Sequence, residues 1–248
     1  MTLIVRSYIN EDWPIGRKRY LDPQWLCYRI KFYLTYTIPS LLKQTDLDFH
    51  IWLDCRPGSE DELEPYWVVL QEAGVNLTFD RGKRFLNNLE GSPSDVMVTR
   101  IDSDDCYAPD AIALIKRLHG NHQATQFTDG FIYLVQEKQA YPMQHYSPPF
   151  YTLRLQIDEN GLVDRPHKGH NAVRDTFNAL ILPPGKICML RHGKQGTVNA
   201  LGRPMGKVFG PGTSDWNRLM ETFSLNNPTQ FWRSRDCPKI KRLLNIYD

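Results

Sequence analysis

Short apolar runs alternate with amphipathic stretches along the first half of the chain. Runs rich in β-branched and aromatic residues predict four strands, at 2–8, 49–54, 75–80 and 95–101. Between them, apolar positions spaced three and four residues apart predict helices over 25–42, 59–74 and 109–120. Pro39 is expected to kink or restart the first helix, and Ser59 to cap the second. This alternation indicates a parallel sheet wound as in nucleotide-binding folds.

The second half of the chain has a different pattern. Strands are predicted at 127–136, 150–157 and 179–193, with long irregular connections, and helices at 216–225 and 238–247. The change near residue 121 has no linker composition, so it marks a change of role within one domain. We therefore expect a single α/β domain over 1–248, with a mixed, mainly parallel central sheet flanked by helices.

Composition excludes several classes of protein. Hydrophobic residues make up 41% and charged residues 23% of the chain, an ordinary balance for a globular protein. No apolar run approaches the ~20 residues of a membrane span, and the first residues lack the features of a signal peptide. The five cysteines are scattered and odd in number, which is typical of reduced thiols. We expect a cytoplasmic protein.

The net charge of +2 conceals a segregation of charge. Residues 46–105 contain 14 Asp or Glu against 5 Lys or Arg, whereas 186–248 contain 11 Lys or Arg against 4 Asp or Glu. An acidic block beside a basic block suits a site that binds a metal ion and a polyanion together. Solvated faces of ordinary helices would give the same count.

Acidic residues follow the fourth predicted strand directly, in the sequence Asp102-Ser103-Asp104-Asp105. Residues at the end of such a strand lie at the carboxyl edge of the sheet, where open α/β folds bind ligands. Asp102 and Asp104 can face one ion there, and carboxylate oxygens suit Mg²⁺ or Mn²⁺. The alternative is that one of these residues caps the helix that starts at Pro109, a role for which one Asp is enough.

Other acidic and phosphate-binding motifs do not fit. A calcium-binding EF-hand loop starting at Asp102 would need Gly at 107 and Glu at 113, where Tyr107 and Ala113 stand. A phosphatase loop of the DxDxT type would need Thr in place of Cys106. The glycine-rich loops that bind phosphate, GxxxxGK[ST] and GxGxxG, are missing from the sequence.

The segment TRIDSDD (99–105), followed by a helix that starts with proline, resembles the DxD element of GT-A-fold glycosyltransferases. More narrowly, the chain resembles a rhamnosyltransferase family of bacteria and phages. The similar segments are the first strand with Arg6, IPSLLKQTDLDFHIWLD (38–54), TRIDSDD, and the late His-Gly element LRHGKQGTVNALG (190–202). The stretch 121–178 of this chain matches that family poorly.

This resemblance implies a GT-A-like fold and a metal-dependent enzyme that transfers a sugar from a nucleotide-diphosphate donor to a glycan or other hydroxyl acceptor. Residues 1–120 would bind the donor, and residues 121–248, with a basic C-terminal region, the acceptor. The resemblance places Mn²⁺ or Mg²⁺ on Asp104, with Asp102 nearer the ribose or a metal-bound water and Asp105 beside them. His192 is the best match for a third ligand, with His170 and His167 as alternatives.

Further residues are assigned to the donor by the same resemblance. Arg6 and Asp54 are candidates for the nucleotide base, and Arg84 and Arg100 for the diphosphate. Arg84 and Arg100 could equally form structural ion pairs with the surrounding acids.

The catalytic base is expected in the acceptor half. An inverting transferase needs a base beside the acceptor hydroxyl, whereas a retaining one can act without it. Asp129, which precedes Gly130, is the first candidate, although Asp-Gly is also typical of a turn. Other acids in this half are Asp158, Glu159 and Asp175.

The basic C-terminal region has three interpretations. Its charged residues are Lys186, Arg191, Lys194, Arg203 and Lys207. They would close over the diphosphate as a lid, hold an anionic acceptor, or form a solvated face. Two alternative functions stay open as well. One is metal-dependent nucleotidyl transfer, although the glycine-rich, lysine-containing entry loop is missing. The other is binding or modification of nucleic acid on the same fold, which no RNA-binding signature favours.

Overall fold

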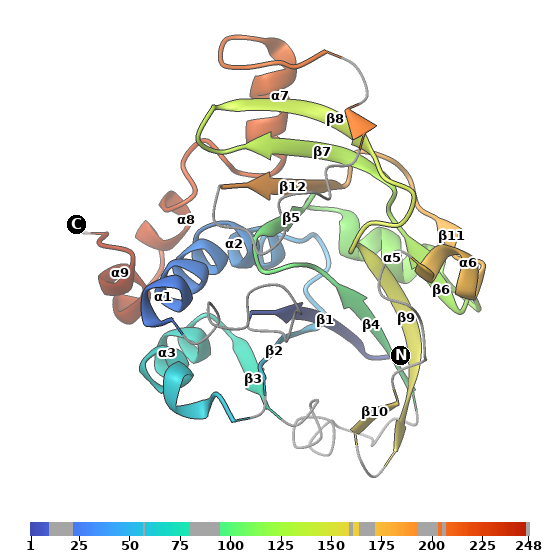
Figure 1. The fold of residues 1–248 in the computed structure, drawn as a ribbon, viewed down its shortest axis with the longest axis horizontal. Helices are drawn as coiled ribbons and strands as arrows, with labels where there is room; N and C mark the ends of the chain where they lie inside the picture. Colours follow the sequence, from blue (N-terminus) through green and yellow to red (C-terminus); the bar gives the residue numbers. More distant parts are fainter. Residues whose placement is uncertain are drawn as a thin grey trace.

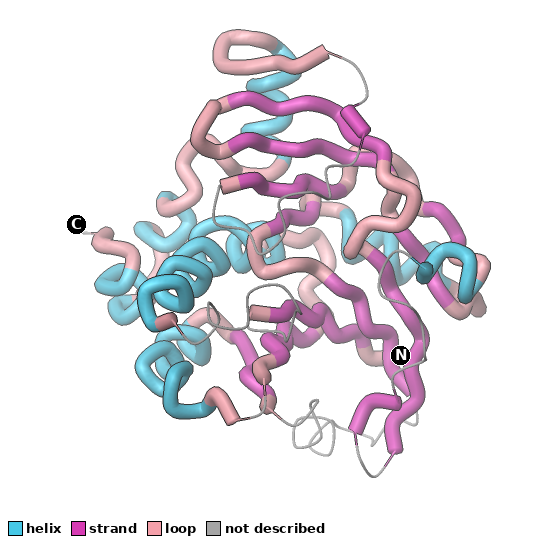
Figure 2. The backbone as a smooth tube through the Cα atoms, in the orientation of Figure 1, coloured by secondary structure: helices cyan, strands magenta, loops and turns pink. Residues whose placement is uncertain are grey.

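The computed structural model describes residues 1–9, 22–56, 58–79, 95–158, 161–163, 172–192, 203–204 and 207–246. These residues form a larger and a smaller β-sheet, with helices along their sides. In the view of Figures 1 and 2 the smaller sheet lies above the larger one. The expected α/β class with a mixed, mainly parallel central sheet is confirmed, and a second sheet accompanies it.

The larger sheet contains the strands expected in the first half of the chain. Its members are β1 (Leu3–Tyr8), β2 (His50–Asp54), β3 (Val75–Thr78), β4 (Asp95–Arg100), β6 (Ala124–Gln126), β9 (Tyr151–Asp158), β10 (Gly161–Val163) and β11 (Leu180–Ile181). The order is β11-β6-β9-β4-β1-β2-β3, with β10 beside β9. β1 pairs in parallel with both β2 and β4, and β9 runs antiparallel to β4. The strand order therefore reverses between β1 and β4.

The smaller sheet is mostly antiparallel and has the order β13-β8-β7-β12-β5. It consists of β5 (Asp105–Tyr107), β7 (Asp129–Leu134), β8 (Gln139–Gln144), β12 (Ile187–Arg191) and β13 (Arg203–Pro204). The single strand predicted at 179–193 is wrong, because Pro183, Pro184 and Gly185 separate β11 from β12. Asp105 lies in β5 and not in a turn, so the chain passes from one sheet to the other within the acidic segment.

The helices line both sheets: α1 (Pro23–Phe32), the π-helical turn η1 (Tyr33–Thr37), α2 (Ile38–Leu42), α3 (Glu60–Glu72), α5 (Ala111–His119), α6 (Val173–Phe177), α7 (Ser214–Thr222), α8 (Gln230–Arg233) and α9 (Pro238–Leu243). The predicted kink before Pro39 is a π turn. Proline has no N–H to donate, and the turn before it widens, so that Ile38 N–H bonds to Tyr33 O. Ser59 stands at the N-cap of α3 but donates to Arg56 O, at 2.7 Å, without capping the helix.

Three apolar clusters hold these layers together. The largest lies between the parallel strands and helices α1, α2, α3, α8 and α9, with Ile30, Leu34 and Trp232 fully buried. A second covers the other face of the larger sheet, around Trp52. The third packs α7 onto the smaller sheet through Trp216. Burial of apolar surface in these clusters fixes the two sheets relative to each other.

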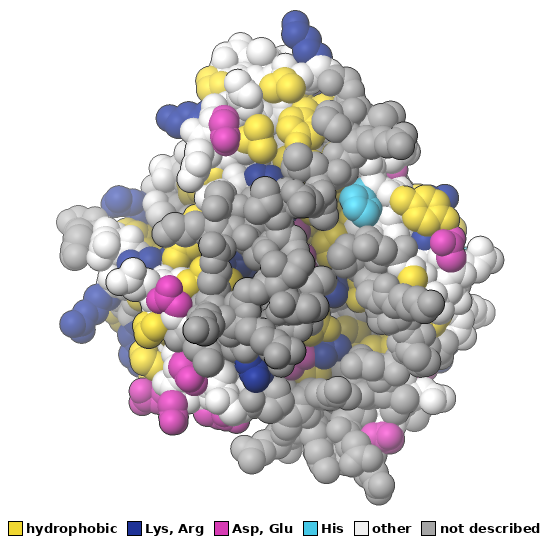
Figure 3. Space-filling model, viewed as in Figure 1, with side chains coloured by type: hydrophobic (Ala, Val, Ile, Leu, Met, Phe, Trp, Pro, Cys, Tyr) yellow, Lys and Arg dark blue, Asp and Glu magenta, His cyan; other side chains and the backbone are white. Residues whose placement is uncertain are grey.

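The charge segregation lies partly on exposed helix surfaces. Acidic side chains gather over α3 and basic ones over α8 and α9 (Figures 1 and 3). Glu60, Asp61 and Glu64 are exposed, and α9 packs against α3, where Ile240 N–H bonds to Glu72 at 2.8 Å. The alternative of solvated helix faces thus applies to these acids. In the described parts of the chain, no helix is long and apolar enough to span a membrane.

Candidate functional site

The acidic segment lies where the strand order of the larger sheet reverses. Asp102, Ser103 and Asp104 form a turn, closed by a 3.1 Å hydrogen bond from Asp105 N–H to Asp102 O, that joins β4 to β5. β1 ends beside it, because β1 and β4 are parallel neighbours. The carboxyl ends of two such strands mark the place where open α/β sheets bind ligands. The sequence prediction of an acidic cluster at this edge is confirmed in position.

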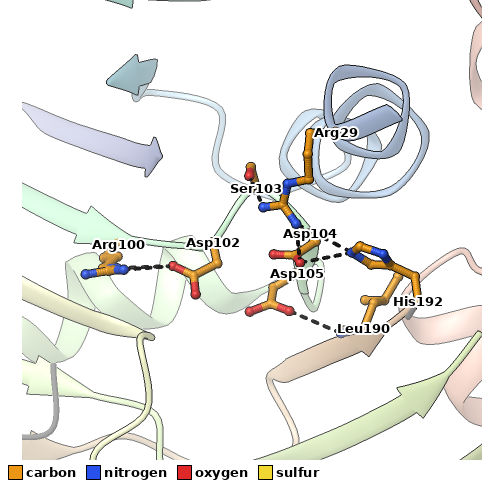
Figure 4. Close-up of polar contacts among 8 residues, drawn as sticks. All are labelled: Arg29, Arg100, Asp102, Ser103, Asp104, Asp105, Leu190 and His192. Carbon is orange, nitrogen blue, oxygen red and sulfur yellow. Dashed lines mark hydrogen bonds and ion pairs between the residues drawn. The ribbon is translucent and has the colours of Figure 1, made fainter. Parts of the chain in front are cut away.

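Asp104 is paired with an arginine from α1. Arg29 Nη1 donates to Asp104 Oδ2 at 2.5 Å, and its Nη2 donates to Ser103 Oγ at 2.5 Å. His192 Nε2 lies 3.1 Å from the same Asp104 oxygen and 3.5 Å from Arg29 Nη1. In Figure 4 the guanidinium points down from α1 into the acidic turn, opposite His192. The structure thus brings two of the predicted ligands, Asp104 and His192, together around a cation supplied by the chain.

The charges of this pair stabilise each other inside the protein. Burial acts to raise the pKa of Asp104, but the Arg29 charge and a hydrogen bond from His192 hold that pKa well below its usual value. Burial acts to lower the pKa of Arg29, and Asp104 raises it above the ordinary value. Both groups are therefore charged. The His192 ring is held by Tyr28 and Phe32, whose centroids lie 5.3 and 4.2 Å from its own.

Asp102 turns away from Asp104 and toward Arg100 (Figure 4). Arg100 donates from Nε and Nη2 to Asp102 Oδ1 at 3.2 and 3.1 Å. The Asp102 side chain is 34% exposed against 11% for Asp104, so Asp102 is the more accessible carboxylate of the turn. It is the member of the cluster best placed to meet a ligand.

Arg6 and Asp54 form a further ion pair at the same edge, between β1 and β2. The guanidinium carbons of Arg6 and Arg100 lie 4.7 and 4.8 Å from the centroid of the Tyr8 ring, at the end of β1. The ion-pair alternative for Arg100 is therefore observed, and binding of a nucleotide by Arg6, Asp54 and Arg100 stays a prediction. Arg84 lies outside the described residues.

Asp105 points to β12. It is buried and accepts a hydrogen bond from Leu190 N–H at 3.1 Å. Burial, followed by the charges of Asp104 and Asp102, raises its pKa well above the usual value. By holding β12 next to the acidic turn, Asp105 places His192, the residue after β12, beside Asp104.

The predicted ion, Mn²⁺ or Mg²⁺, does not fit these side chains as they are arranged. Asp104 Oδ2 already contacts Arg29 and His192, and Asp102 faces Arg100. Among the described residues, no group of three or more His, Cys, Asp or Glu side chains is placed to hold a metal. His167 and His170 lie outside those residues. Binding of Mn²⁺ or Mg²⁺ here would require these contacts to rearrange, and it stays a prediction.

Asp129 lies away from the acidic turn. It begins β7, and Phe131, two residues later, lies opposite Cys188, which is four residues before His192. At about 3.3 Å per residue, Asp129 is therefore about 20 Å from His192 along the strands. Its carboxylate accepts hydrogen bonds from Thr128 and Gln144. The geometry does not favour Asp129 as a base for chemistry at the acidic turn.

The glycine after Asp129 has a packing role. A Cβ at Gly130 would lie 2.4 Å from the Ile187 carbonyl oxygen, a distance that real Cβ atoms do not show. Glycine is thus needed where β7 crowds against the start of β12. The Asp-Gly pattern lies inside a strand and forms no turn.

The other acids and bases of the second half are dispersed. Asp158 ends β9, and Asp175, on α6, accepts a hydrogen bond from Tyr146 at 2.5 Å. Lys186 pairs with Asp110 at 2.6 Å, and Lys207 is exposed. Glu159, Lys194 and the side chain of Arg203 lie outside the described residues. The lid and the anionic-acceptor interpretations therefore stay predictions.

Arg29 is the site residue that the sequence analysis missed. It stands three residues after Leu26 and next to Ile30, on the buried face of α1. A charged residue within an apolar stripe requires a buried partner of opposite charge, and that is the signal that could have found it.

Comparisons with known proteins give distant structural similarity only. No protein-family model matches the chain, and no curated protein matches its sequence. TarS 1–349 of S. aureus, solved alone and with UDP, has a TM-score of 0.41 and 12% identity, covering 98% of this chain and 69–70% of TarS 1–349. A cytidylyltransferase of Leptospira borgpetersenii has a TM-score of 0.36 and 9% identity, covering 75% of this chain and 76% of its own. The glycosyltransferase GlyE of Streptococcus pneumoniae has a TM-score of 0.27 and 15% identity, covering 50% of this chain and 29% of GlyE.

Proposed function

We propose that this chain is a glycosyltransferase that takes a sugar from a nucleotide-diphosphate donor and transfers it to a hydroxyl group of a glycan or other acceptor. One observation carries the proposal: the acidic turn follows β4 next to the carboxyl end of β1, where the guanidinium carbons of Arg6 and Arg100 lie 4.7 and 4.8 Å from the centroid of the Tyr8 ring. Guanidinium groups bind phosphate oxygens, and an accessible carboxylate accepts hydrogen bonds from ribose hydroxyls. A nucleotide diphosphate needs both.

Different residues would bind the ribose, the diphosphate and the base of the donor. Asp102, the exposed carboxylate, would accept hydrogen bonds from the ribose. Arg100, held in place by Asp102, would face the diphosphate, and Arg6 and Tyr8 would lie toward the base. In the reaction, the bond between the anomeric carbon and the diphosphate oxygen breaks, the acceptor oxygen bonds to that carbon, and the acceptor hydroxyl gives its proton to a base or to the departing diphosphate. Positive charge at the diphosphate stabilises the leaving group as its negative charge grows. The acceptor is expected against residues 121–248.

The test is release of nucleotide from a panel of UDP-, GDP- and dTDP-sugars, rhamnosyl donors included, with Mn²⁺ and separately with EDTA. We expect at least one donor to be turned over. Loss of a charged hydrogen bond in Asp102→Ala should lower kcat/KM about 10- to 100-fold. Asp95→Asn is the matched control, because Asp95 starts the same strand, pairs with Arg154 at its far end and should leave kcat/KM unchanged.

Two results would contradict the proposal. One is that no member of the panel is turned over or bound under either condition. The other is that Asp102→Ala handles donors as well as the unchanged protein does. Pyrophosphate release from a nucleoside triphosphate, with every sugar donor inert, would indicate nucleotidyl transfer instead.

A further inference from the structure

The geometry points to Arg29 as the built-in cation of this site. We infer that its guanidinium takes the place that a divalent metal would take on Asp104, and that a nucleotide diphosphate binds at this edge without a metal ion. The second part rests on the proposed function, whereas the first concerns the chain alone. Arg29 acts here as a positioning residue, because it holds Asp104 and the acidic turn and no contact with substrate is assigned to it.

One carboxylate oxygen of Asp104, the one that faces His192, already has two partners. Asp104 Oδ2 lies 2.5 Å from Arg29 Nη1 and 3.1 Å from His192 Nε2. A Mg²⁺ or Mn²⁺ ion bound to this oxygen would lie about 2.1 Å from it. Two cations would then share one carboxylate oxygen within a few ångströms of each other, and their repulsion would be large in a buried site.

Arg29 is also fixed too firmly to leave the site for an ion. Its second terminal nitrogen donates to Ser103 Oγ, and its guanidinium carbon lies 5.8 Å from the centroid of the Trp25 ring. The residue is 8% exposed and extends from the buried face of α1, whose N-terminus is capped by Asp22. Displacing it would leave a buried guanidinium without its carboxylate, which is strongly destabilising.

Three carboxylates at this edge are paired with arginines among the described residues. The pairs are Asp54 with Arg6, Asp102 with Arg100, and Asp104 with Arg29. A cluster of unpaired carboxylates would repel a diphosphate and need a metal to bind it. Paired in this way, the carboxylates do not impose that requirement.

The first experiment uses the unchanged protein and needs no substrate. Titration with Mn²⁺, followed by the electron paramagnetic resonance signal of the free ion, should show no binding at the protein concentration used. Calorimetry with UDP, GDP and dTDP should then give, for the nucleotide that binds, the same Kd in EDTA and in Mn²⁺ within about threefold. Mn²⁺ binding that Asp104→Asn abolishes, or nucleotide binding that requires Mn²⁺, would overturn the inference while leaving the proposed function intact.

Failure of the proposed function looks different. If no nucleotide binds with or without the ion, the function is rejected, and the Mn²⁺ titration of the protein alone still decides whether Arg29 holds the metal position.

Variants at Arg29 supply the second test. Arg29→Gln frees Asp104 and His192, so the variant should gain Mn²⁺ binding, lose nucleotide affinity about 10- to 100-fold in EDTA, and recover it with Mn²⁺. Arg29→Lys keeps the charge and should stay independent of metal. Arg154→Gln, on β9, removes a half-exposed ion pair outside the site and should behave as the unchanged protein. If Arg29→Gln does not fold, Arg29→Lys and the unchanged protein decide. Metal-independent nucleotide binding by a folded Arg29→Gln, at unchanged affinity, contradicts the inference.

Discussion

His119 is a buried histidine that the protein keeps neutral. It ends α5 with no exposed surface, and its Nδ1 lies 3.2 Å from Thr125 Oγ1. Burial, followed by the charges of His122 and Arg154, lowers its pKa to about 4. An unfolded histidine has a pKa of about 6.5. Between these values the unfolded chain binds a proton that the folded protein does not, so the free energy of unfolding decreases as the pH falls.

We predict that His119 accounts for a measurable part of the acid sensitivity of the protein. From pH 7 to pH 4.5, its contribution to the loss of stability should be about 2–3 kcal/mol. Urea denaturation across this range should show a shallower pH dependence for His119→Gln. His122→Gln is the comparison: His122 is exposed, and its charge is a smaller cause of the low pKa of His119 than burial, so this variant should keep most of the pH dependence. Equal slopes for His119→Gln and the unchanged protein would contradict this explanation.

At the same scale, the sequence located the site but not its chemistry. The acids after the fourth strand could be placed at the sheet edge because a run of apolar residues ending in carboxylates is a local pattern. Arg29 could not be placed, because its partner Asp104 is 75 positions away and pairs with it only after α1 packs beside the β4–β5 turn. His192 was identified by resemblance, and β12 brings it to Asp104. Asp129 was favoured by a local Asp-Gly pattern that packing against Ile187 explains.

At the scale of elements, the π turn leaves one backbone carbonyl without its helical donor, and a helix far along the chain supplies another donor. Because Ile38 N–H bonds to Tyr33 O, Leu34 O loses the partner that it would have in an α-helix. Trp232, on α8, donates its indole N–H to this carbonyl at 2.6 Å. Trp232 is 1% exposed, so the bond is shielded from water. The widened turn and the C-terminal helix are therefore coupled through one hydrogen bond.

We predict that Trp232→Phe destabilises the protein by about 1–3 kcal/mol, since it keeps an aromatic ring and leaves a buried carbonyl unsatisfied. Chemical denaturation measures the change. Trp67→Phe is the matched control, because Trp67 lies on α3 and is 38% exposed, and its effect should stay within about 0.5 kcal/mol. Comparable effects of the two substitutions would show that the Leu34 carbonyl does not depend on Trp232.

The elements that the sequence predicted correctly are the ones with a clear local period. β1, β2, β3 and β4 are apolar runs, and α3, α5 and α7 have apolar stripes. β5 was missed because its three residues, Asp105, Cys106 and Tyr107, have no period to detect. β8 was missed because it contains Pro142, and a proline counts against a strand. The structure tolerates Pro142 because β13 pairs only with Met143 and Gln144, so Pro142 lies outside the pairing with β13.

At the scale of the whole molecule, the acidic turn is the junction between the two sheets. β4 belongs to the larger sheet and β5 to the smaller one, and only Ile101 to Asp104 separate them. The site is built from both: Arg29 comes from the helix on the larger sheet, and His192 follows β12 of the smaller sheet. The smaller sheet depends on pairings such as β12 with β5, between residues 80 to 84 positions apart. No local pattern encodes such pairings. The sequence could therefore predict that the acidic residues lie at the sheet edge, but not that β12 brings His192 beside them.

The C-terminal helices α8 and α9 belong to the same core as the parallel strands of the larger sheet, and the last prediction follows from this. Phe231, Trp232, Ile240 and Ile246 are buried in the cluster that contains α1, α2 and the parallel strands. Burying each such side chain stabilises a fold by about 1.5–3 kcal/mol, so together they contribute about 6–12 kcal/mol. The total stability of a domain is about 5–15 kcal/mol. A chain that ends at residue 225 should therefore lack a cooperative unfolding transition and the near-ultraviolet circular dichroism of packed aromatic rings. A chain that ends after Ile246 is the control and should retain both. If the shorter chain unfolds cooperatively within a few degrees of the full chain, then α8 and α9 are an appendage and the core is complete without them.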